Sequence, residues 1–514
     1  MPKATIFTYK SYKFEPEKKK IIFKYEIEFE DGRSMEFIDK VVLPKDEASA
    51  KGKLLHCYNN AEVDNLLHSL HIILGISYYK LFVPPKVRLS NPLSRNQAEF
   101  FNTVYKKGLG EFCYRNKIDP KRIAKFPFTV KRGLTPFKGV RPQRDNSANK
   151  ILLGIAGGKD SIVAGELLKQ QGEDITGFVV DTHDNMRIPE KIAEIMGVKI
   201  LKIKHELDEK IYKPMEDAYK GHIPFSAVVG FLGTLIAYLY GYSYVAVGNE
   251  HSANFGNITY KGEEVNPAPF GQNNLAISWF SKSKENISRK DGFQIFRKDK
   301  LPERCGVNHQ WSKTSEFEGM MQEYVHKYIS SNITYFSAVR PFYEIRVVEM
   351  FSKYKKYFPY FTSCNESFKK NSSLFQREDR RDFSMIIPRS INKTAFPSPT
   401  HRKIPPFDCR SGQALSPPLQ KGETRLWCGQ CPKCAFVFTM LAAFLTKKEL
   451  LAIFRKNLFE DKKLLPVFND LLGFGKVKPF DCVGTFEEMR AAFLMAGKKY
   501  RDTAMMKEFL SVIP

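Results

Sequence analysis

Cysteine is scarce in this sequence: nine residues among 514 are too few for a disulfide scaffold in a chain of this size. Four of the nine crowd between positions 409 and 434, which indicates metal binding in a reducing compartment. The N-terminal residues also lack the basic stretch followed by an apolar stretch that marks a secretory signal. We therefore expect a cytoplasmic protein.

Long uncharged runs are also few, and one of them raises the question of a membrane span. Residues 223 to 249 contain no charged side chain and are numerous enough to cross a bilayer. Gly241 and the two residues after it divide this run into a helix-length piece and a short strand rich in Val and Ala. That division is typical of a buried helix and a central strand of an α/β domain, so we predict no membrane span.

Acidic residues are outnumbered, with 56 Asp and Glu against 81 Lys and Arg, for a net charge of +25. Such a surplus is common in proteins that bind nucleic acid. However, two irregular stretches, 266 to 307 and 366 to 424, hold eight basic against four acidic residues and eleven against six. The surplus that remains also suits a small anionic substrate, and we expect no nucleic-acid partner.

The length predicts two or three domains. Apolar residues alternate from 21 to 43 on either side of Asp31-Gly32, which indicates a β-hairpin. Helical spacing follows at 61 to 74 and 98 to 115. We therefore predict an N-terminal α+β domain over 1–132, which ends in a Pro-, Gly- and Arg-rich linker over 133–149.

Beyond the linker, strands and helices alternate, which predicts a doubly wound parallel sheet with ligands at the carboxyl ends of its strands. This α/β domain spans 150–365, with an insertion at 266–307. A second insertion, predicted to be disordered, covers 366–426, and a helical region with a cysteine cluster covers 427–514. The predicted strands are 151–155, 175–181, 198–203 and 244–247, and the predicted helices are 160–171, 189–196 and 225–240.

The first of these strands runs into the loop Ala156-Gly157-Gly158-Lys159-Asp160-Ser161 and then into a helix. Backbone N–H groups and the helix N-terminus converge there, a geometry that binds anions. The glycines permit close backbone approach, Lys159 supplies a point charge, and the Ser161 hydroxyl can reach a phosphate oxygen. Asp160 can hold Mg²⁺ or cap the helix. The alternative is an ordinary strand-to-helix turn, but the strand–helix alternation that follows favours a phosphate site.

The loop is not a Walker A motif, because Asp rather than Ser or Thr follows the lysine. It resembles the Ser-Gly-Gly-x-Asp-Ser signature of the PP-loop ATP pyrophosphatases, with Ala156 in place of the usual Ser or Gly. The resemblance implies a fold of that type (HUP-like). It also implies cleavage of ATP between its α- and β-phosphates, with transfer of the adenylyl group to a substrate oxygen.

Three thiols, Cys428, Cys431 and Cys434, stand at two-residue gaps that let them converge on one tetrahedral Zn²⁺. A closed site needs a fourth ligand. Cys364, just before the second insertion, is preferred to Cys409, which lies inside it. An iron–sulfur cluster is the competing metal site, and three cysteines without a metal are the simpler alternative. We expect the zinc to be structural. It would hold the segment after the second insertion against a predicted helix over 435–445.

Further strings resemble one family of that superfamily, the ATP-dependent UDP-N-acetylmuramoyl-L-alanyl-L-glutamate epimerases of peptidoglycan synthesis. The resemblance covers most of the chain. The strings are Gly75-Ile-Ser-Tyr-Tyr-Lys80, Gly108-Leu-Gly-Glu-Phe-Cys-Tyr-Arg-Asn116, Gly248-Asn-Glu250, Ser252-Ala-Asn254, His309-Gln-Trp-Ser-Lys313 with Glu318, Ser337-Ala-Val-Arg-Pro341 with Glu344, Ser363-Cys-Asn365 and Cys482-Val-Gly-Thr-Phe-Glu-Glu488. The chain departs from the family by its two insertions, which are harmless if their ends stay adjacent.

The resemblance implies that the terminal L-glutamate of UDP-MurNAc-L-Ala-L-Glu becomes D-glutamate while ATP and water give AMP and pyrophosphate. An α-hydrogen beside a carboxylate is very weakly acidic. Adenylation removes the negative charge, so a modest side-chain base can take that proton. The muramoyl dipeptide is thus the expected small-molecule partner.

Which residue acts as the base is left open by the sequence. The candidates are His309, Lys313, Glu318 and Cys364, with packing, an exposed ion pair or zinc binding as their alternatives. Arg115 and Arg340 are candidates to hold the substrate's carboxylates or diphosphate, with surface salt bridges as the alternative. Asn249 and Glu250 complete the predicted substrate-binding set.

Two other functions compete with the epimerase. One is a nucleobase- or tRNA-modifying enzyme of the 7-cyano-7-deazaguanine synthase type, which also joins a similar loop to a zinc–cysteine cluster. It leaves the N-terminal hairpin and the string at 108–116 unexplained. The other is a degenerate nucleotide-binding protein whose insertions have abolished turnover.

Overall fold

A computed structural model describes most of the chain, namely residues 3–44, 61–129, 150–182, 187–258, 307–364, 366, 426–475 and 477–513. The predicted linker and nearly all of the two predicted insertions, including Cys409, lie outside these residues.

The described strands form one nine-stranded sheet in the order β4-β1-β2-β3-β7-β6-β5-β8-β9. Their bounds are β1 (Ala4–Glu15), β2 (Lys20–Phe29), β3 (Ser34–Val42), β4 (Lys86–Leu89), β5 (Lys150–Gly154), β6 (Asp174–Asp181), β7 (Ile200–Glu206), β8 (Tyr244–Val247) and β9 (Thr334–Ser337). From β7 to β9 all neighbours are parallel. The chain moves from β5 to β6 and β7 on one side and returns to β8 and β9 on the other. This topology places a switch point between β5 and β8.

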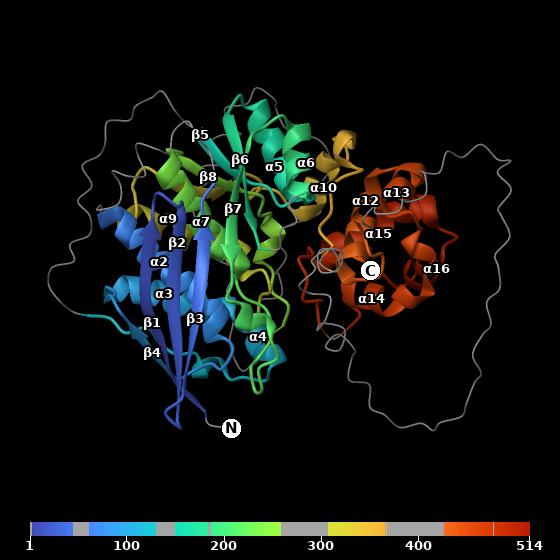
Figure 1. Cartoon of the computed structure of the whole chain (residues 1–514). Coiled ribbons are helices and arrows are strands. Elements are labelled where there is room, and N and C mark those ends of the chain that lie inside the picture. Colours follow the sequence, from blue (N-terminus) through green and yellow to red (C-terminus); the bar gives the residue numbers. More distant parts are fainter. Residues whose placement is uncertain are drawn as a thin grey trace, which may run out of the picture.

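Helices cover both faces of this parallel half, as a sheet buried on two sides requires. Helix α7 (Phe225–Tyr240) lies on one face, and α5 (Lys159–Gln170) and α6 (Arg187–Met196) lie on the other (Figure 1). The alternation of β5 fits this arrangement, because Leu152 joins the core of α7 whereas Leu153 joins the core of α5. The predicted doubly wound α/β sheet is therefore confirmed.

The N-terminal strands continue the same sheet. Strands β2 and β3 form the predicted hairpin, and Gly32 in its turn adopts φ +82°. Strand β1 was not predicted and adds an antiparallel partner to β2. Strand β3 then pairs antiparallel with β7, with Val41 opposite His205. The division of the chain at 133–149 stays a prediction, but the sheet runs across it without a break (Figure 1).

Four helices pack with the N-terminal half: α2 (Ala61–Tyr79), α3 (Arg95–Gly108), α4 (Gly110–Arg115) and α9 (Ser315–Tyr328). The uncharged run forms α7 and β8, as predicted, and most side chains of α7 are buried. No helix in the described ranges is both long and apolar enough to cross a membrane.

The C-terminal region is helical, as predicted, and stands beside α5 and α6 (Figure 1). Its core is continuous with that of the α5 face of the sheet. The helices are α10 (Glu344–Phe351), which joins the two parts, and α12 (Pro432–Phe444), α13 (Lys447–Phe454), α14 (Leu465–Leu471), α15 (Phe486–Tyr500) and α16 (Ala504–Phe509).

The residues that flank the predicted insertions lie next to each other. Val307 forms an antiparallel bridge with Ile258, and the backbone N–H of Asn257 donates to the Val307 carbonyl at 2.7 Å. At the second insertion, the Thr362 hydroxyl donates to the Leu426 carbonyl at 2.6 Å. Both pairs of ends are adjacent, which is the condition under which the insertions leave the fold intact.

Candidate functional site

The loop of residues 156–161, called the phosphate loop below, connects β5 to α5 at the switch point of the sheet. Gly157 adopts φ +91°, and a Cβ on it would lie 2.5 Å from Ile188 Cγ2, so only glycine fits there. Gly158 caps α5 without a side-chain hydrogen bond, which leaves the first helical N–H groups available to an anion. The Ser161 hydroxyl donates to the Gly158 carbonyl at 3.0 Å. The predicted loop residues thus form a turn whose geometry suits an anion.

The loop after β8 presses against the start of α5. A Cβ on Gly248 would lie 2.6 Å from the backbone carbon of Asp160, so glycine is needed for this close approach. The next residue is fixed by β9, because the Asn249 N–H donates to the Ser337 hydroxyl at 2.8 Å and this hydroxyl donates to the Asn249 carbonyl at 2.7 Å. Asn249 and Glu250 are therefore held beside the phosphate loop.

Lys159 lies at the centre of a buried ionic cluster. Its side chain is 1% exposed, and Nζ lies 2.5 Å from Asp160 Oδ1 and 2.7 Å from Glu344 Oε1. Burial lowers the pKa of Lys159, but the two carboxylates outweigh burial and hold this pKa above its usual value. Lys159 therefore stays charged, and it can face a phosphate at the N-terminus of α5.

The pKa values of two buried carboxyl groups near Lys159 are shifted in opposite directions. Burial raises the pKa of Glu250 to about 8, and the charges of Glu344 and Asp160 add to the effect. Burial also acts on Glu344, but Lys159 and Lys433 outweigh it and hold the pKa of Glu344 at about 2. Near neutral pH, Glu250 is a proton donor and Glu344 is an ion, a separation of roles that is common in active sites.

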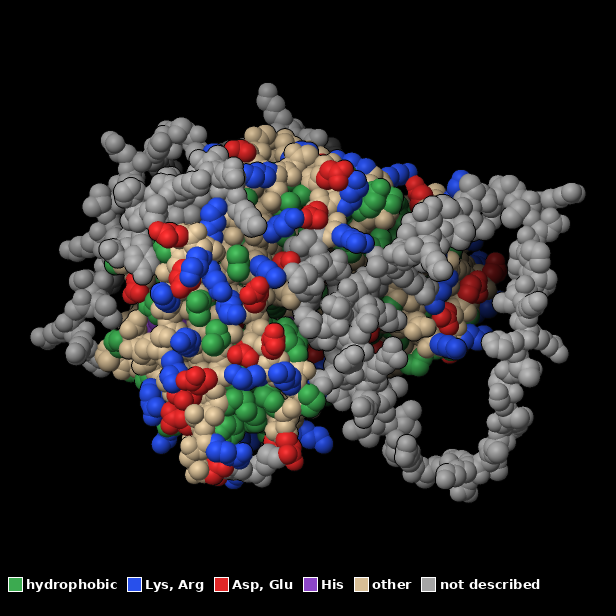
Figure 2. All heavy atoms as spheres, in the orientation of Figure 1, with side chains coloured by type: hydrophobic (Ala, Val, Ile, Leu, Met, Phe, Trp, Pro, Cys, Tyr) green, Lys and Arg blue, Asp and Glu red, His purple; other side chains and the backbone are tan. Residues whose placement is uncertain are grey.

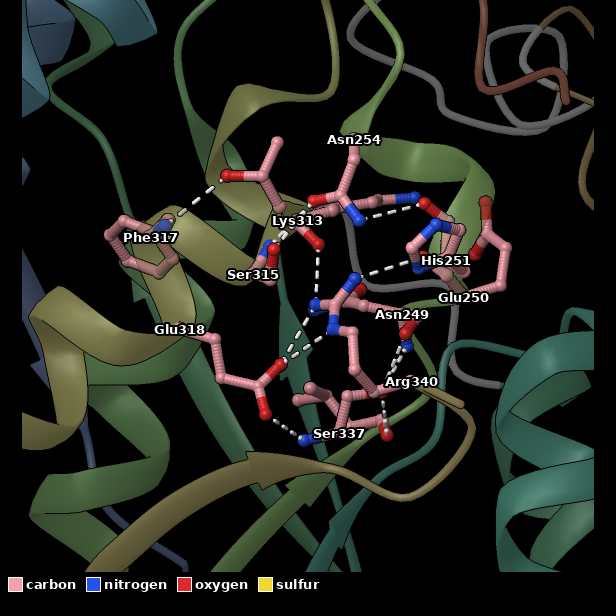
Figure 3. A network of polar contacts seen from close by, with 12 residues as sticks. Asn249, Glu250, His251, Asn254, Lys313, Ser315, Phe317, Glu318, Ser337 and Arg340 are labelled. Atoms are coloured by element: carbon pink, nitrogen blue, oxygen red, sulfur yellow. Dashed lines mark hydrogen bonds and ion pairs between the residues drawn. The ribbon is translucent and has the colours of Figure 1, made fainter. Parts of the chain in front are cut away.

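The buried Arg340 side chain connects three neighbouring segments by hydrogen bonds (Figure 3). Its Nε donates to Glu318 Oε2 at 2.9 Å, Nη1 donates to the Glu250 carbonyl at 2.9 Å, and Nη2 donates to the Lys313 carbonyl at 2.6 Å. Glu318 is further fixed by the Ser337 N–H at 3.1 Å. Through these bonds, Glu318 and Arg340 hold the backbone at Glu250 and Lys313 in place. They therefore favour a positioning role over the predicted roles of Glu318 as the base and of Arg340 as a substrate ligand.

A second ionic group forms around Cys482. The Lys313 ammonium donates to Cys482 Sγ at 3.3 Å, and the His309 imidazole interacts electrostatically with the same thiol. On its other side, His309 Nδ1 contacts Glu111 Oε2. Glu111, His309 and Cys482 therefore form a carboxylate–imidazole–thiol series, with Lys313 as a further cation at the thiol.

The charge states in this group follow from these contacts. Burial would raise the pKa of the Cys482 thiol, but Lys313 and His309 outweigh burial and lower it to about 5. Burial would lower the pKa of His309, but Cys482 and Glu111 raise it to about 10. The pKa of Glu111 falls to about 2 because His309 outweighs burial. The stable form near neutral pH is a thiolate, an imidazolium and a carboxylate.

Lys433 joins the two groups. Its Nζ donates to the Cys482 carbonyl and lies 3.8 Å from Glu344 Oε1, the same oxygen that binds Lys159. Charged contacts therefore run from the phosphate loop through Glu344 and Lys433 to the segment that carries Cys482.

Arg115 lies at the outer edge of the second group. Its Nε donates to Glu111 Oε1 at 2.6 Å, while the side chain remains 45% exposed. The His222 ring lies 4.3 Å from the His309 ring, and burial together with His309 lowers the pKa of His222 to about 3. Ligand atoms of Glu111, His222 and His309 lie within 4.8 Å of one another; Glu111 Oε2 contacts His309 Nδ1 and lies 3.8 Å from His222 Nδ1.

The four cysteines Cys364, Cys428, Cys431 and Cys434 converge, and their sulfurs all lie within 4.8 Å of one another. Cys364 Sγ is 3.9 Å from Cys431 Sγ, and Cys428 Sγ is 3.6 Å from Cys434 Sγ. Backbone N–H groups donate to three of these sulfurs: Cys428 N–H to Cys364 Sγ, Gly429 N–H to Cys434 Sγ and Gln430 N–H to Cys428 Sγ. The cluster can hold a metal ion.

Sequence reasoning missed several residues of this site. Glu111 and Cys482 stood inside strings that had been singled out for their family resemblance, and Glu344 stood beside one, but none had been given a chemical role. His222 and Lys433 carried no signal of their own. Only the fold brings these five side chains to Lys159, His309 and Lys313.

Comparison with known proteins places the chain in one family. The sequence profile described as MurL N-terminal domain matches residues 1–267 and 301–338, and the profile described as MurL C-terminal domain matches residues 415–514. The gap in the first match falls within the predicted insertion at 266–307.

Two relatives named UDP-N-acetyl-alpha-D-muramoyl-L-alanyl-L-glutamate epimerase align with most of the chain. The protein of Xanthomonas oryzae pv. oryzae is 29% identical over 457 residues, which are 88% of this chain and 79% of that protein. The protein of Salinispora tropica is 26% identical over 511 residues, which are 99% of this chain and 89% of that protein.

A shorter similarity concerns the tRNA-specific 2-thiouridylase MnmA of Sulfurimonas denitrificans, with 33% identity over 87 residues, 15% of this chain and 26% of that protein. It agrees with the PP-loop fold type predicted from the sequence. Because the N-terminal profile alone matches more than half of the sequence, the chain belongs to the MurL family.

Proposed function

We propose that this protein epimerises the terminal L-glutamate of UDP-N-acetylmuramoyl-L-alanyl-L-glutamate to D-glutamate, with ATP converted to AMP and pyrophosphate through an acyl-adenylate. The observation that carries the proposal is the series of charged contacts between the phosphate loop and the Cys482 group. One end suits a nucleotide phosphate, and the other end holds a thiolate and cations suited to proton transfer. The names of the relatives supply the substrate.

In the proposed reaction, the loop residues 156–161 and the N-terminus of α5 bind the phosphates of ATP. Lys159 faces the phosphate charge, and Asp160, which is 22% exposed, would hold Mg²⁺. The glutamate carboxylate attacks the α-phosphorus and pyrophosphate leaves. The acyl-adenylate has no carboxylate charge, so its α-hydrogen is more acidic than that of the free acid. Arg115 suits an anionic part of the substrate because it is half-exposed.

The cysteine cluster suits a structural Zn²⁺. Four thiolates around a tetrahedral ion with Zn–S bonds of about 2.3 Å stand about 3.8 Å apart. The Sγ–Sγ separations of 3.6 and 3.9 Å fit this geometry. Zinc would supply no chemistry here beyond holding the segments 362–364 and 426–434 together.

One assay tests the proposed reaction. Purified protein is incubated with ATP and UDP-MurNAc-L-Ala-L-Glu, and both pyrophosphate release and the chirality of the glutamate are measured. We expect the two products in step. Pyrophosphate without D-glutamate would contradict the epimerase, and stimulation of pyrophosphate release by tRNA would favour a tRNA-modifying enzyme. ATP binding without turnover would favour the degenerate protein.

A further inference from the structure

Cys482 combines two properties that a buried structural cysteine lacks. It contacts two cations, Lys313 and His309, and it retains partial solvent access. Cys113 offers the contrast within the same molecule: it is fully buried, and burial raises the pKa of its thiol to about 12. The Cys482 sulfur is a stabilised thiolate, held by two cations in a residue that is only partly buried.

The other candidate bases are committed elsewhere. Glu318 is held by Arg340 and the Ser337 N–H, and Cys364 belongs to the four-cysteine cluster. Both His309 and Lys313 retain their protons, because their contacts with Cys482 and nearby carboxylates raise their pKa values despite burial. A proton acceptor must be deprotonated before the step begins, and in this group the thiolate meets that condition.

We infer that Cys482 removes the α-proton of the activated glutamyl group, an inference that rests on the proposed function. The Cα–H bond breaks, the proton passes to Sγ to form a thiol, and the electron pair of the bond forms an enolate. The Lys313 ammonium, 3.3 Å from the sulfur, stands where it can stabilise the enolate oxygen. A Brønsted acid then returns a proton to the opposite face. Glu250 suits this role because burial raises its pKa to about 8 and because Arg340 donates to both the Glu250 and the Lys313 carbonyls, which holds the two segments together.

The test separates adenylation from proton abstraction. Wild-type protein and the variants Cys482→Ala and Cys482→Ser are incubated with ATP, Mg²⁺ and UDP-MurNAc-L-Ala-L-Glu in D₂O. Substrate-dependent ATP–pyrophosphate exchange reports the adenylate, and mass spectrometry of the glutamate reports deuterium at Cα. We expect both variants to keep pyrophosphate exchange within about threefold of wild type, whereas deuterium incorporation falls by at least two orders of magnitude. Cys113→Ala, the matched control at a thiol outside the site, should retain both.

Four outcomes would overturn the inference. A smaller loss of deuterium incorporation would mean that another group removes the proton. Loss of pyrophosphate exchange in both Cys482 variants would assign the residue to the adenylation step. A substrate acyl group found on Cys482 by intact-mass measurement would make it a nucleophile. If wild-type protein shows neither exchange reaction, the proposed function fails first, and the role of Cys482 fails with it.

Discussion

At the scale of single residues, the site keeps several buried groups in charge states that burial alone would not allow. Glu250 is the exception, because burial and its carboxylate neighbours act in the same direction and keep it protonated up to a pH of about 8. The unfolded chain releases this proton near pH 4.5. The folded state thus binds more protons between these two values, and the contribution to stability, full below pH 4.5, is lost as the pH rises through 8.

Glu250→Gln should therefore flatten the pH dependence of stability. For one proton, the slope removed is at most about 1.4 kcal/mol per pH unit. Urea denaturation of both proteins at pH 5, 7 and 9 measures it. The wild type should lose stability relative to the variant as the pH increases, and parallel curves would show that Glu250 titrates normally.

The Glu318–Arg340 pair makes a prediction of a different kind. Both side chains are less than 10% exposed, so Glu318→Gln leaves the Arg340 charge buried without its partner. We expect a loss of about 3–5 kcal/mol in the free energy of unfolding. Glu323→Gln, an exposed position on the same helix, should change it by less than about 0.5 kcal/mol. Equal effects of the two substitutions would refute the bracing role of the pair.

At this scale the sequence predicted some roles and not others. The phosphate loop was readable because its residues are consecutive and backbone geometry dictates their types. Cys482 was not, since its low pKa comes from Lys313 and His309, which are more than 160 residues away in the sequence. Charge coupling of this kind depends on the fold and leaves no local pattern.

At the scale of elements, one short backbone segment links the four-cysteine cluster to the phosphate loop. The Thr362 N–H donates to the Gly157 carbonyl at 3.1 Å, and Cys364 stands two residues further along. Removal of a bound metal should therefore release the segment that supports the loop. We expect chelation to lower the melting temperature and to weaken ATP binding at least tenfold, about 1.4 kcal/mol.

Metal content, thermal unfolding and ATP titration before and after chelation measure this coupling. Zn²⁺ added back should restore both properties, and Cys428→Ser should imitate the chelated protein. Unchanged ATP affinity in metal-free protein would show that the cluster and the loop are independent.

The bounds of most strands and helices of the parallel half were predicted within a few residues. Each of these strands is a short apolar run, and a stretch with helical spacing of apolar residues follows it. Strand β1 was missed, although it is twelve residues long. Polar residues interrupt its apolar face, and the register shifts near Tyr9 and Ser11 break its alternation. Pairing with β2 and β4 stabilises it, and such non-local contacts cannot be read from the strand itself.

At the scale of the whole molecule, basic residues outnumber acidic ones by 81 to 56. On the face shown in Figure 2, basic and acidic side chains are interspersed rather than gathered by sign. Among the described residues visible on that face, the basic side chains do not form one continuous surface.

Replacement of residues 260–305 by a linker of about six residues should preserve the fold, because Ile258 and Val307 are already paired. An eightfold shorter loop lowers the entropic cost of closure by about 2 kcal/mol. Urea denaturation should thus show equal or higher stability. A large loss of stability or of cooperativity would mean that the segment contributes to the core.

The continuity of the sheet has a consequence for solubility. A parallel sheet that ended at β7 would expose the backbone of a seven-residue strand to other chains. Strand β3 instead pairs with the last three residues of β7, and the two outermost strands of the described sheet are β4 and β9, each only four residues long. Short edges offer few unpaired N–H and C=O groups. The N-terminal strands therefore shield part of the edge of the parallel sheet from other chains.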